Sequence, residues 1–297
     1  MWQFLETSLQ DATPIALAAL AGTFAARCGI FHLGLEGLMC VGAFTAVAVT
    51  IGTGNVATGL AVSVIVCALL SVLFWAITVK LKADPIIAGL ALTTLGLGAS
   101  TFAQETLFST RGTITAPQGL WQPFAGTGFP MPTLSVIVLV TPLIVIASWI
   151  TLRRSRFGFS LSAIGEFPYA ARSAGINIDR MRLTALAVGG VLCALAGAQL
   201  ALGGLTSFSS DMTAGRGFIA FSAVVLGGSH PLGAAAASLF FGAANTLGIQ
   251  AQLAKWPVPL ELVLMLPYIL TIVAVALTGV FLRKGTVAQS AFGELRS

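Results

Sequence analysis

The sequence predicts an all-α fold, namely a polytopic helical membrane protein with about nine transmembrane passes. Of its 297 residues, 57% are hydrophobic and only 8% are charged, whereas soluble domains carry roughly 25% charged residues. The mean hydropathy is +0.95. Apolar runs of about 20 residues recur along the chain, and each can cross a hydrocarbon core of about 30 Å. A single membrane domain over residues 1–297 is therefore expected.

The individual spans follow from these apolar runs, taken in chain order. The first five are expected at about Asp11 to Ala26, Leu33 to Ile51, Ala57 to Val79, Ile86 to Ala103 and Thr133 to Leu152. The later four are expected at Leu183 to Leu205, Gly217 to Gly228, Leu232 to Ile249 and Pro259 to Leu282. The seventh run is short for a crossing, which leaves the number of passes around 217–232 open. Because no Lys or Arg precedes Arg27, we expect the N-terminus to remain as part of the first span rather than act as a removable signal peptide.

Threading these spans with alternating orientation sorts the basic residues to one side of the membrane. That side receives twelve of the fifteen Lys and Arg residues: Arg27, Lys80, Lys82, Arg153, Arg154, Arg156, Arg172, Arg180, Arg182, Arg283, Lys284 and Arg296. Only Arg111, Arg216 and Lys255 fall on the other side. The positive-inside rule makes the crowded side cytoplasmic, with the N-terminus outside and the C-terminus inside. The net charge of +5 then reflects membrane topology rather than a nucleic-acid partner.

Two connections are too long to be simple links between helices. The outer loop, 104–132, is rich in Pro and Gly and carries Trp121, which favours an irregular lid or docking surface. The inner loop, 153–182, opens with a basic cluster and then places Phe157, Leu161 and Ile164 at helical spacing. This stripe predicts a short amphipathic helix that either lies on the lipid interface or fits a groove on a soluble partner.

Glu36 is the most unusual residue within the predicted spans. A carboxylate within the hydrocarbon costs about 2.5 to 3.5 kcal/mol on insertion scales, and neighbouring glycines such as Gly34 and Gly37 make a helix interruption easy. Glu36 therefore either lines the solute path or holds neighbouring helices through hydrogen bonds. His32, four residues earlier, would share a helix face with Glu36 on a continuous helix. A structural hydrogen bond is the favoured role for His32 over a proton relay.

Further polar and aromatic residues occur at similar expected depth. Those assigned to the substrate pathway, besides Glu36 and His32, are Thr93, Thr94, Gln104, Phe221 and Asn245. Phe208, Phe218 and Phe221 flank the short seventh span, where they either stack on a ring or anchor the helix at the interface.

Enzyme motifs are missing from the sequence. There is no Gly-rich phosphate-binding loop, no hydrolase elbow and no metal-ligand cluster. The four cysteines fall in or beside apolar runs, where they are expected to pack as small hydrophobic residues. The chain is thus expected to be non-catalytic and to bind neither a cofactor nor a metal.

Three motifs resemble the permease family that serves branched-chain amino acid, ribose-type sugar and nucleoside ABC importers. The first, RCGI at 27–30 with LGLEG at 33–37 and GAF at 42–44, is similar to the second-span signature of the nucleoside branch. The second, AIGE at 163–166 followed by Pro168, Ala170, Ala171, Gly175 and Arg180, looks like the family's coupling loop. The third is FSAVVLGG at 221–228 with PLGA at 231–234.

The resemblance implies a type II ABC importer permease with broken helices. Two permease chains would form the pathway, a separate ATPase would use ATP, and a solute-binding protein would deliver cargo across a bacterial inner membrane. It places the ATPase-coupling residues at Phe157, Leu161, Ile164, Glu166, Ala170, Ala171 and Gly175. The expected cargo is a nucleoside, with a simple sugar as the alternative.

Two other classes of protein compete with the importer subunit. An ion-coupled secondary transporter would use Glu36 and His32 as its ion site, but such a carrier has no need of the basic inner loop. A membrane-embedded enzyme would need a nucleophile and a base within reach of each other, or a metal set, and two scattered histidines give it little support.

Overall fold

The computed structural model describes residues 2–126, 131–254 and 265. Its helices are α1 (Trp2–Arg27), α2 (Leu35–Thr53), α3 (Val56–Trp75) with its extension η1 (Ala76–Lys80), α4 (Pro85–Phe108), α5 (Val136–Arg154), α6 (Arg156–Glu166), α7 (Pro168–Ser173), α8 (Ile178–Leu202), α9 (Arg216–Leu226) and α10 (Pro231–Leu253). The expected ninth span, Pro259 to Leu282, and the basic residues from Lys255 onward lie outside the described residues.

Six of the described helices are long and apolar enough to cross a membrane: α2, α3 with η1, α4, α5, α8 and α10. The expected seventh span is instead the 11-residue helix α9, about 16 Å long, which is too short to cross. Helix α1 is 26 residues long and buried over most of its length, but its first turns carry Glu6 and Asp11 and it is not among the six. The described residues therefore support a polytopic helical protein without establishing nine passes.

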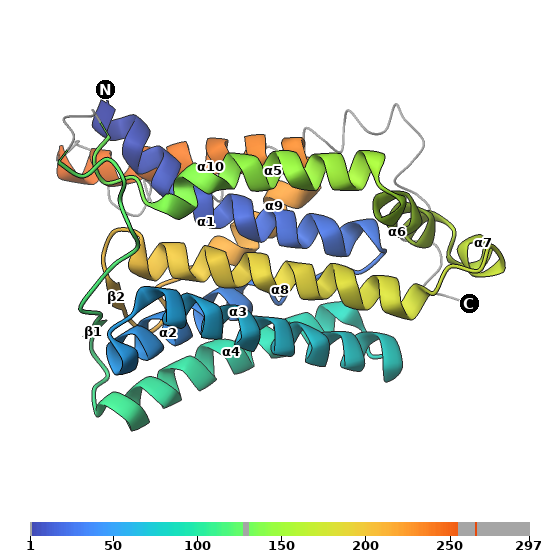
Figure 1. Cartoon of the computed structure of the whole chain (residues 1–297), viewed down its shortest axis with the longest axis horizontal. Coiled ribbons are helices and arrows are strands. Elements are labelled where there is room, and N and C mark those ends of the chain that lie inside the picture. Colours follow the sequence, from blue (N-terminus) through green and yellow to red (C-terminus); the bar gives the residue numbers. More distant parts are fainter. Residues whose placement is uncertain (1, 127–130, 255–264, 266–297) are drawn as a thin grey trace.

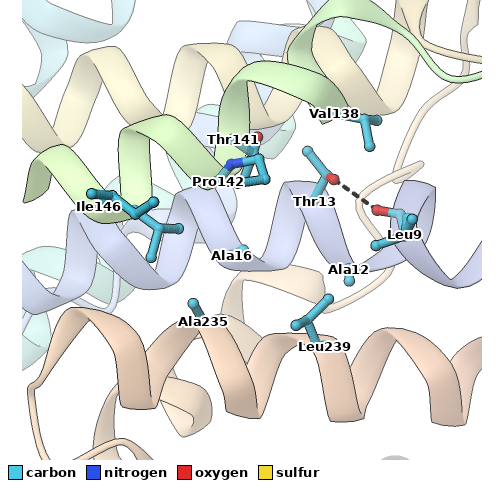
Figure 2. A pocket seen from close by; sticks show the side chains of 11 residues that line it. Leu9, Ala12, Thr13, Ala16, Val138, Thr141, Pro142, Ile146, Ala235 and Leu239 are labelled. Carbon is cyan, nitrogen blue, oxygen red and sulfur yellow. Dashed lines mark hydrogen bonds between the residues drawn. The ribbon is translucent and has the colours of Figure 1, made fainter. Parts of the chain in front are cut away.

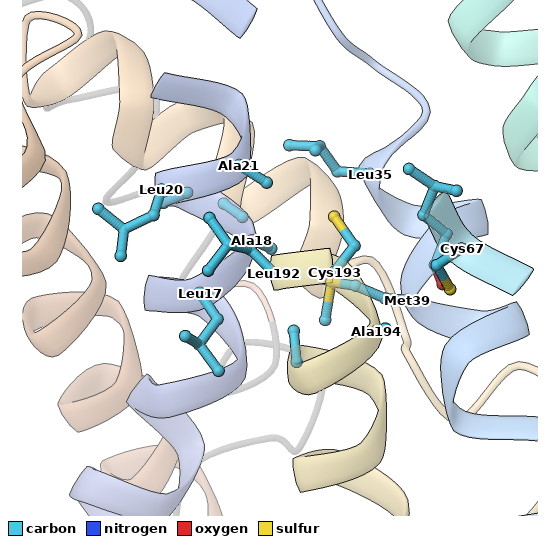
Figure 3. Packing of buried hydrophobic residues seen from close by; sticks show 14 of the residues in the cluster. Leu17, Ala18, Leu20, Ala21, Leu35, Met39, Cys67, Leu192, Cys193 and Ala194 are labelled. Carbon is cyan, nitrogen blue, oxygen red and sulfur yellow. The ribbon is translucent and has the colours of Figure 1, made fainter. Parts of the chain in front are cut away.

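The long helices run side by side, with α1 and α8 in the middle of the bundle (Figure 1). Leu17 and Leu20 of α1, Met39 of α2 and Cys193 of α8 belong to one buried hydrophobic core (Figure 3). Small residues let the backbones approach closely. At Gly197 of α8, an added Cβ would lie 2.2 Å from the carbonyl oxygen of Met39, so any larger residue would push α8 and α2 apart. All four cysteines are buried and free of disulfide bonds, in line with the expected packing as small hydrophobic residues.

The outer loop is partly ordered by a two-residue ribbon. Strand β1 (Ile114–Thr115) pairs antiparallel with β2 (Ser207–Phe208). The N–H of Leu120 also donates to the carbonyl of Leu202 at 2.9 Å. Since α4 runs to Phe108, the irregular segment starts later than expected, and Gln104 lies in the helix. The loop is thereby attached to the segment 203–215 that leads into α9.

The last turns of α1 and α5, the first turns of α8 and helices α6 and α7 lie together at the other end of the bundle (Figure 1). These segments carry Arg27, Arg153, Arg154, Arg156, Arg172, Arg180 and Arg182. Arg27 Nε donates to the carbonyl of Ser229 at 2.8 Å, and Arg182 Nε donates to the carbonyl of Cys28 at 3.3 Å. Arg216 lies apart from these residues, near Asp11 of α1. It begins α9 inside the bundle, with a side chain that is only 19% exposed.

Candidate solute pathway and coupling surface

Glu36 joins the first turns of two helices. Its side chain is buried, with the whole residue 2% exposed, and the carboxylate accepts the N–H of Gly215 at 2.9 Å and that of Gly217. The first N–H groups of a helix have no partner within the helix and carry a partial positive charge. A carboxylate that receives them is therefore stabilised in a site where burial alone would be costly. Glu36 itself lies in the first turn of α2.

Helix α9 packs directly on this turn of α2, which requires a residue without a side chain at Gly217. A Cβ there would lie 2.4 Å from the backbone N of Glu36 and 2.5 Å from its Cα. Gly215, the N-cap of α9, adopts a left-handed φ of 79°, which glycine accepts readily. These two glycines explain why the carboxylate can approach the backbone of α9.

The contact between Glu36 and α9 lies about half-way along the bundle. The far end of α9 is near Arg27, which donates to Ser229 just after that helix. A helix of 11 residues covers about 16 Å, roughly half of a 30 Å hydrocarbon core. Because α2 starts at the same contact, the non-helical segment 28–34 spans the distance from the basic end to this point (Figure 1).

The segment 28–34 is non-helical, with turns at 28–29 and 33–34, and the residues between these turns alternate between buried and exposed. Ile30 and His32 are buried while Phe31 is exposed. The His32 ring stacks on Phe74 at 4.2 Å, and its Nδ1 accepts the N–H of Gly34 at 3.3 Å. Its Nε2 has no hydrogen-bond partner among the described residues.

His32 and Glu36 do not share a helix face. The continuous helix that would have placed them on one face is not formed, because α2 begins only at Leu35, after the N-cap Gly34. No group of three or more His, Cys, Asp or Glu residues that could hold a metal ion occurs in the described part of the chain.

A second carboxylate, that of the partly buried Asp11 of α1, lies near Arg216 at the start of α9. Its Oδ2 accepts hydrogen bonds from Asn245 Nδ2 at 3.0 Å and Thr246 Oγ1 at 3.1 Å, both on α10. Its Oδ1 is 4.0 Å from Arg216 Nη2. Sequence reasoning missed Asp11 and Arg216, although an ionisable residue at the edge of an apolar run is itself a signal. Asn245, predicted for the pathway, belongs to this network.

The remaining predicted pathway residues lie at different places. Thr93 Oγ1 donates to the carbonyl of Leu33 at 3.1 Å and so ties α4 to the segment 28–34. Phe221 of α9 meets Phe31 edge-on, with ring centroids 6.4 Å apart. Thr94 is exposed. Gln104 is buried near the C-terminal end of α4, where its Nε2 donates to the carbonyl of Gly112.

An apolar cavity of about 240 Å³ lies between α1, α5 and α10 (Figure 2). Its lining residues include Leu9, Ala16, Pro142, Val145 and Leu239. The hydroxyl of Thr13, which also lines it, is already bonded to the carbonyl of Leu9 at 2.7 Å. The cavity thus offers little to a polar solute, and none of the predicted pathway residues lines it.

The predicted amphipathic helix is confirmed as α6, but its apolar stripe faces the core of the chain's own helix bundle. Leu161 and Ile164 are fully buried, and Phe157 packs against the main core. The reason is a tight turn from α5 into α6, where a Cβ on Gly158 would lie 2.4 Å from the carbonyl oxygen of Leu152. The expectation that these three side chains face lipid or a partner is therefore corrected.

The exposed apolar residues at this end are different ones. Phe159, Phe167 and Tyr169 are 64%, 69% and 81% exposed. Of the other predicted coupling residues, Glu166, Ala170 and Gly175 are exposed, and Ala171 is buried in a small cluster with Ile164 and Ile178. The helical period indicated an apolar stripe but could not show that α6 folds back onto its own bundle.

Comparisons with known proteins place this sequence in a family. The family model described as branched-chain amino acid transport system / permease component matches residues 4–275. The chain belongs to this family. It is a multi-pass membrane protein of the ABC permease class, as its motifs indicated.

Several relatives are similar over most of their length. The guanosine ABC transporter permease protein NupQ of Bacillus subtilis is 35% identical over 92% of this chain and 90% of its own. The nucleoside ABC transporter permease protein NupC of Lactococcus lactis is 32% identical, over 89% and 88%. The putative glucose ABC transporter permease protein TsgC13 of Haloferax volcanii is 31% identical, over 84% and 77%. No solved structure matches the chain.

Proposed function

We propose that this chain is the membrane-spanning permease subunit of an ATP-driven importer for nucleosides. The observation that carries the proposal is the likeness over most of the chain to two relatives named for guanosine and nucleoside transport. The chain forms half of the translocation pathway and is not itself catalytic. ATP is used by a separate ATPase subunit, and a second permease chain, a paralogue or a copy, completes the pathway.

The orientation follows from charge. The end that carries Arg27, Arg153, Arg154 and Arg182 faces the cytoplasm of a bacterial cell, with the N-terminus outside and the C-terminus inside. The gathering of α6, α7 and the basic ends of α1 and α8 at one end supports this assignment (Figure 1).

The interrupted spans are part of the proposal. Helices α2 and α9 both begin at the Glu36 contact, and each is preceded by a non-helical segment. Irregular backbone at membrane depth is tolerated where it is buried in protein or lines a water-filled cavity, and transporters place substrate sites at such breaks. We assign the solute pathway to the region around this contact, with Glu36 as its structural joint.

The ATPase contact is assigned to the exposed face of the inner loop rather than to its buried stripe. Phe159, Phe167 and Tyr169 present apolar surface beside the exposed residues Glu166 and Ala170. Exposed apolar side chains rimmed by polar residues are typical of protein interfaces. Ile164, Ala171 and Leu161 then act as the packing that holds this face to the bundle.

Trp121 in the outer loop is expected to contact the solute-binding protein. Its side chain is 71% exposed, while the backbone around it is held to Leu202 and Val136. Replacing Trp121 with Ala should reduce uptake at low concentrations of loaded binding protein by about threefold to tenfold, since aromatic residues dominate interface energies. The test is the half-saturation for binding protein in proteoliposomes. Unchanged half-saturation, with normal complex assembly, would show that Trp121 contributes nothing to docking.

A simple sugar remains the second candidate cargo because relatives named for glucose and fructose also match. Competition between labelled guanosine and unlabelled solutes for uptake distinguishes a nucleoside cargo from a sugar cargo. Cells that depend on this chain for uptake should accumulate labelled guanosine, and unlabelled nucleosides should suppress that uptake at concentrations where glucose and ribose do not. Suppression by the free sugars alone would move the assignment to sugar transport.

An ion-coupled carrier has less support in the site. The Glu36 carboxylate is occupied by two backbone N–H groups, and His32 faces Phe74 rather than Glu36. A proton path between them would need a continuous set of hydrogen bonds that these contacts do not form.

A further inference from the structure

We propose that Phe31, Phe218 and Phe221 form an aromatic face in the pathway over which the base of the nucleoside passes. The inference rests on the proposed function, and it adds the residues that meet the planar ring. Phe31 and Phe218 are 37% and 39% exposed, and Phe221 is partly buried against Phe31. All three are close to the Glu36 contact in the chain.

The backbone argues against a lipid-facing position for this surface. Phe31 belongs to the non-helical segment 28–34, where it is exposed between the buried residues Ile30 and His32. In the proposed orientation this segment lies at hydrocarbon depth, where irregular backbone is found only against protein or water. The exposed side of the segment must therefore face a water-filled cavity or another chain.

Helix α9 continues the same surface. Its buried side, with Gly217, Ala220 and Val224, packs on the bundle. Phe218 and Phe221 are three residues apart and so lie on neighbouring positions of a helix surface. The edge-on contact between Phe221 and Phe31 joins the helix to the non-helical segment 28–34.

The chemistry of the face selects for a planar ring. Phenyl groups cannot donate or accept the strong hydrogen bonds that sugar hydroxyls make, whereas any nucleobase offers a π-face for stacking or edge-on contact. A series of weak aromatic contacts also suits a pathway, because the solute must leave each position as well as reach it.

Thiol accessibility tests where the face points. The native cysteines at 28, 40, 67 and 193 are buried, so they should react little with a maleimide. A Phe218→Cys variant of the full importer therefore adds one accessible thiol to this chain. We expect a membrane-impermeant maleimide to label it from one side of proteoliposomes, and guanosine to slow that labelling. Phe240→Cys on α10, at a side chain that is 48% exposed, is the matched control and should remain unlabelled.

Transport provides the second measurement. Phe218→Leu keeps an apolar side chain and removes the ring, and it should lower kcat/KM for guanosine about twofold to tenfold, the range expected for one aromatic contact. Phe240→Leu should not change it.

The remaining outcomes would overturn the inference. Labelling of Phe218→Cys only by a lipid-soluble reagent assigns the face to lipid. Labelling only when the second permease chain is omitted assigns it to the interface between chains. Unchanged kcat/KM in Phe218→Leu likewise removes the stacking role. A parent importer that takes up no nucleoside would instead refute the proposed function.

Discussion

Replacing Glu36 with Ala should abolish nucleoside uptake and lower the thermal stability of the chain. The substitution leaves the N–H groups of Gly215 and Gly217 without their acceptor. Each buried unsatisfied group costs about 1 to 3 kcal/mol. The first turn of α9 would then no longer be fixed to α2. Thermal unfolding of the purified chain and uptake by the assembled importer measure the two effects.

Glu36→Gln separates charge from hydrogen bonding. The amide oxygen can still accept one N–H, but the charge-assisted character is lost, so we expect uptake to fall about tenfold or more with a smaller loss of stability. Glu105→Gln is the matched control, because Glu105 is exposed and pairs with Arg111 at 2.8 Å. Wild-type stability and uptake in Glu36→Ala would contradict the claim that the Glu36 carboxylate fixes the first turn of α9 to α2.

Serine substitutions at Phe159 and Tyr169 should release the ATPase and stop transport while leaving the chain folded. Both side chains are exposed, so the fold loses little. An interface that buries them loses about 1.5 to 3 kcal/mol for each, which together corresponds to about 100-fold weaker association or more. Co-purification of the ATPase and ATP-dependent uptake are the measurements.

Leu161→Ser distinguishes a docking surface from internal packing. Leu161 is fully buried against the core, so this variant should lower the thermal stability and yield of the chain by itself, before any partner is added. If Leu161→Ser leaves stability unchanged but releases the ATPase, whereas the Phe159 and Tyr169 variant binds normally, then the buried stripe is the coupling surface after all.

Much of the fold could be predicted from composition and hydrophobic runs. Most long spans were placed within a few residues, because an apolar stretch of sufficient length has few alternatives in a membrane. The amphipathic helix at Phe157 to Ile164 was also found from its period. The interruption before α2 was indicated by Gly34 and Gly37, yet its exact position depends on the contact with α9, far away in sequence.

The site was harder to predict because its contacts join distant segments. Glu36 meets Gly215 and Gly217 across 179 and 181 positions, and Asp11 meets Asn245 across 234. Periodicity carries no information on such pairs. For the same reason, the stripe on α6 could not be assigned to lipid, a partner or the chain's own bundle before the turn at Gly158 was known.

ATP-dependent accumulation of a nucleoside tests the central claim most directly. The chain should be reconstituted in proteoliposomes with its second permease chain, ATPase and guanosine-loaded binding protein. We predict accumulation of labelled guanosine with ATP, none with ADP, and none with a proton gradient in place of ATP. Accumulation driven by the proton gradient without ATP would contradict the importer assignment and would restore the ion-coupled carrier.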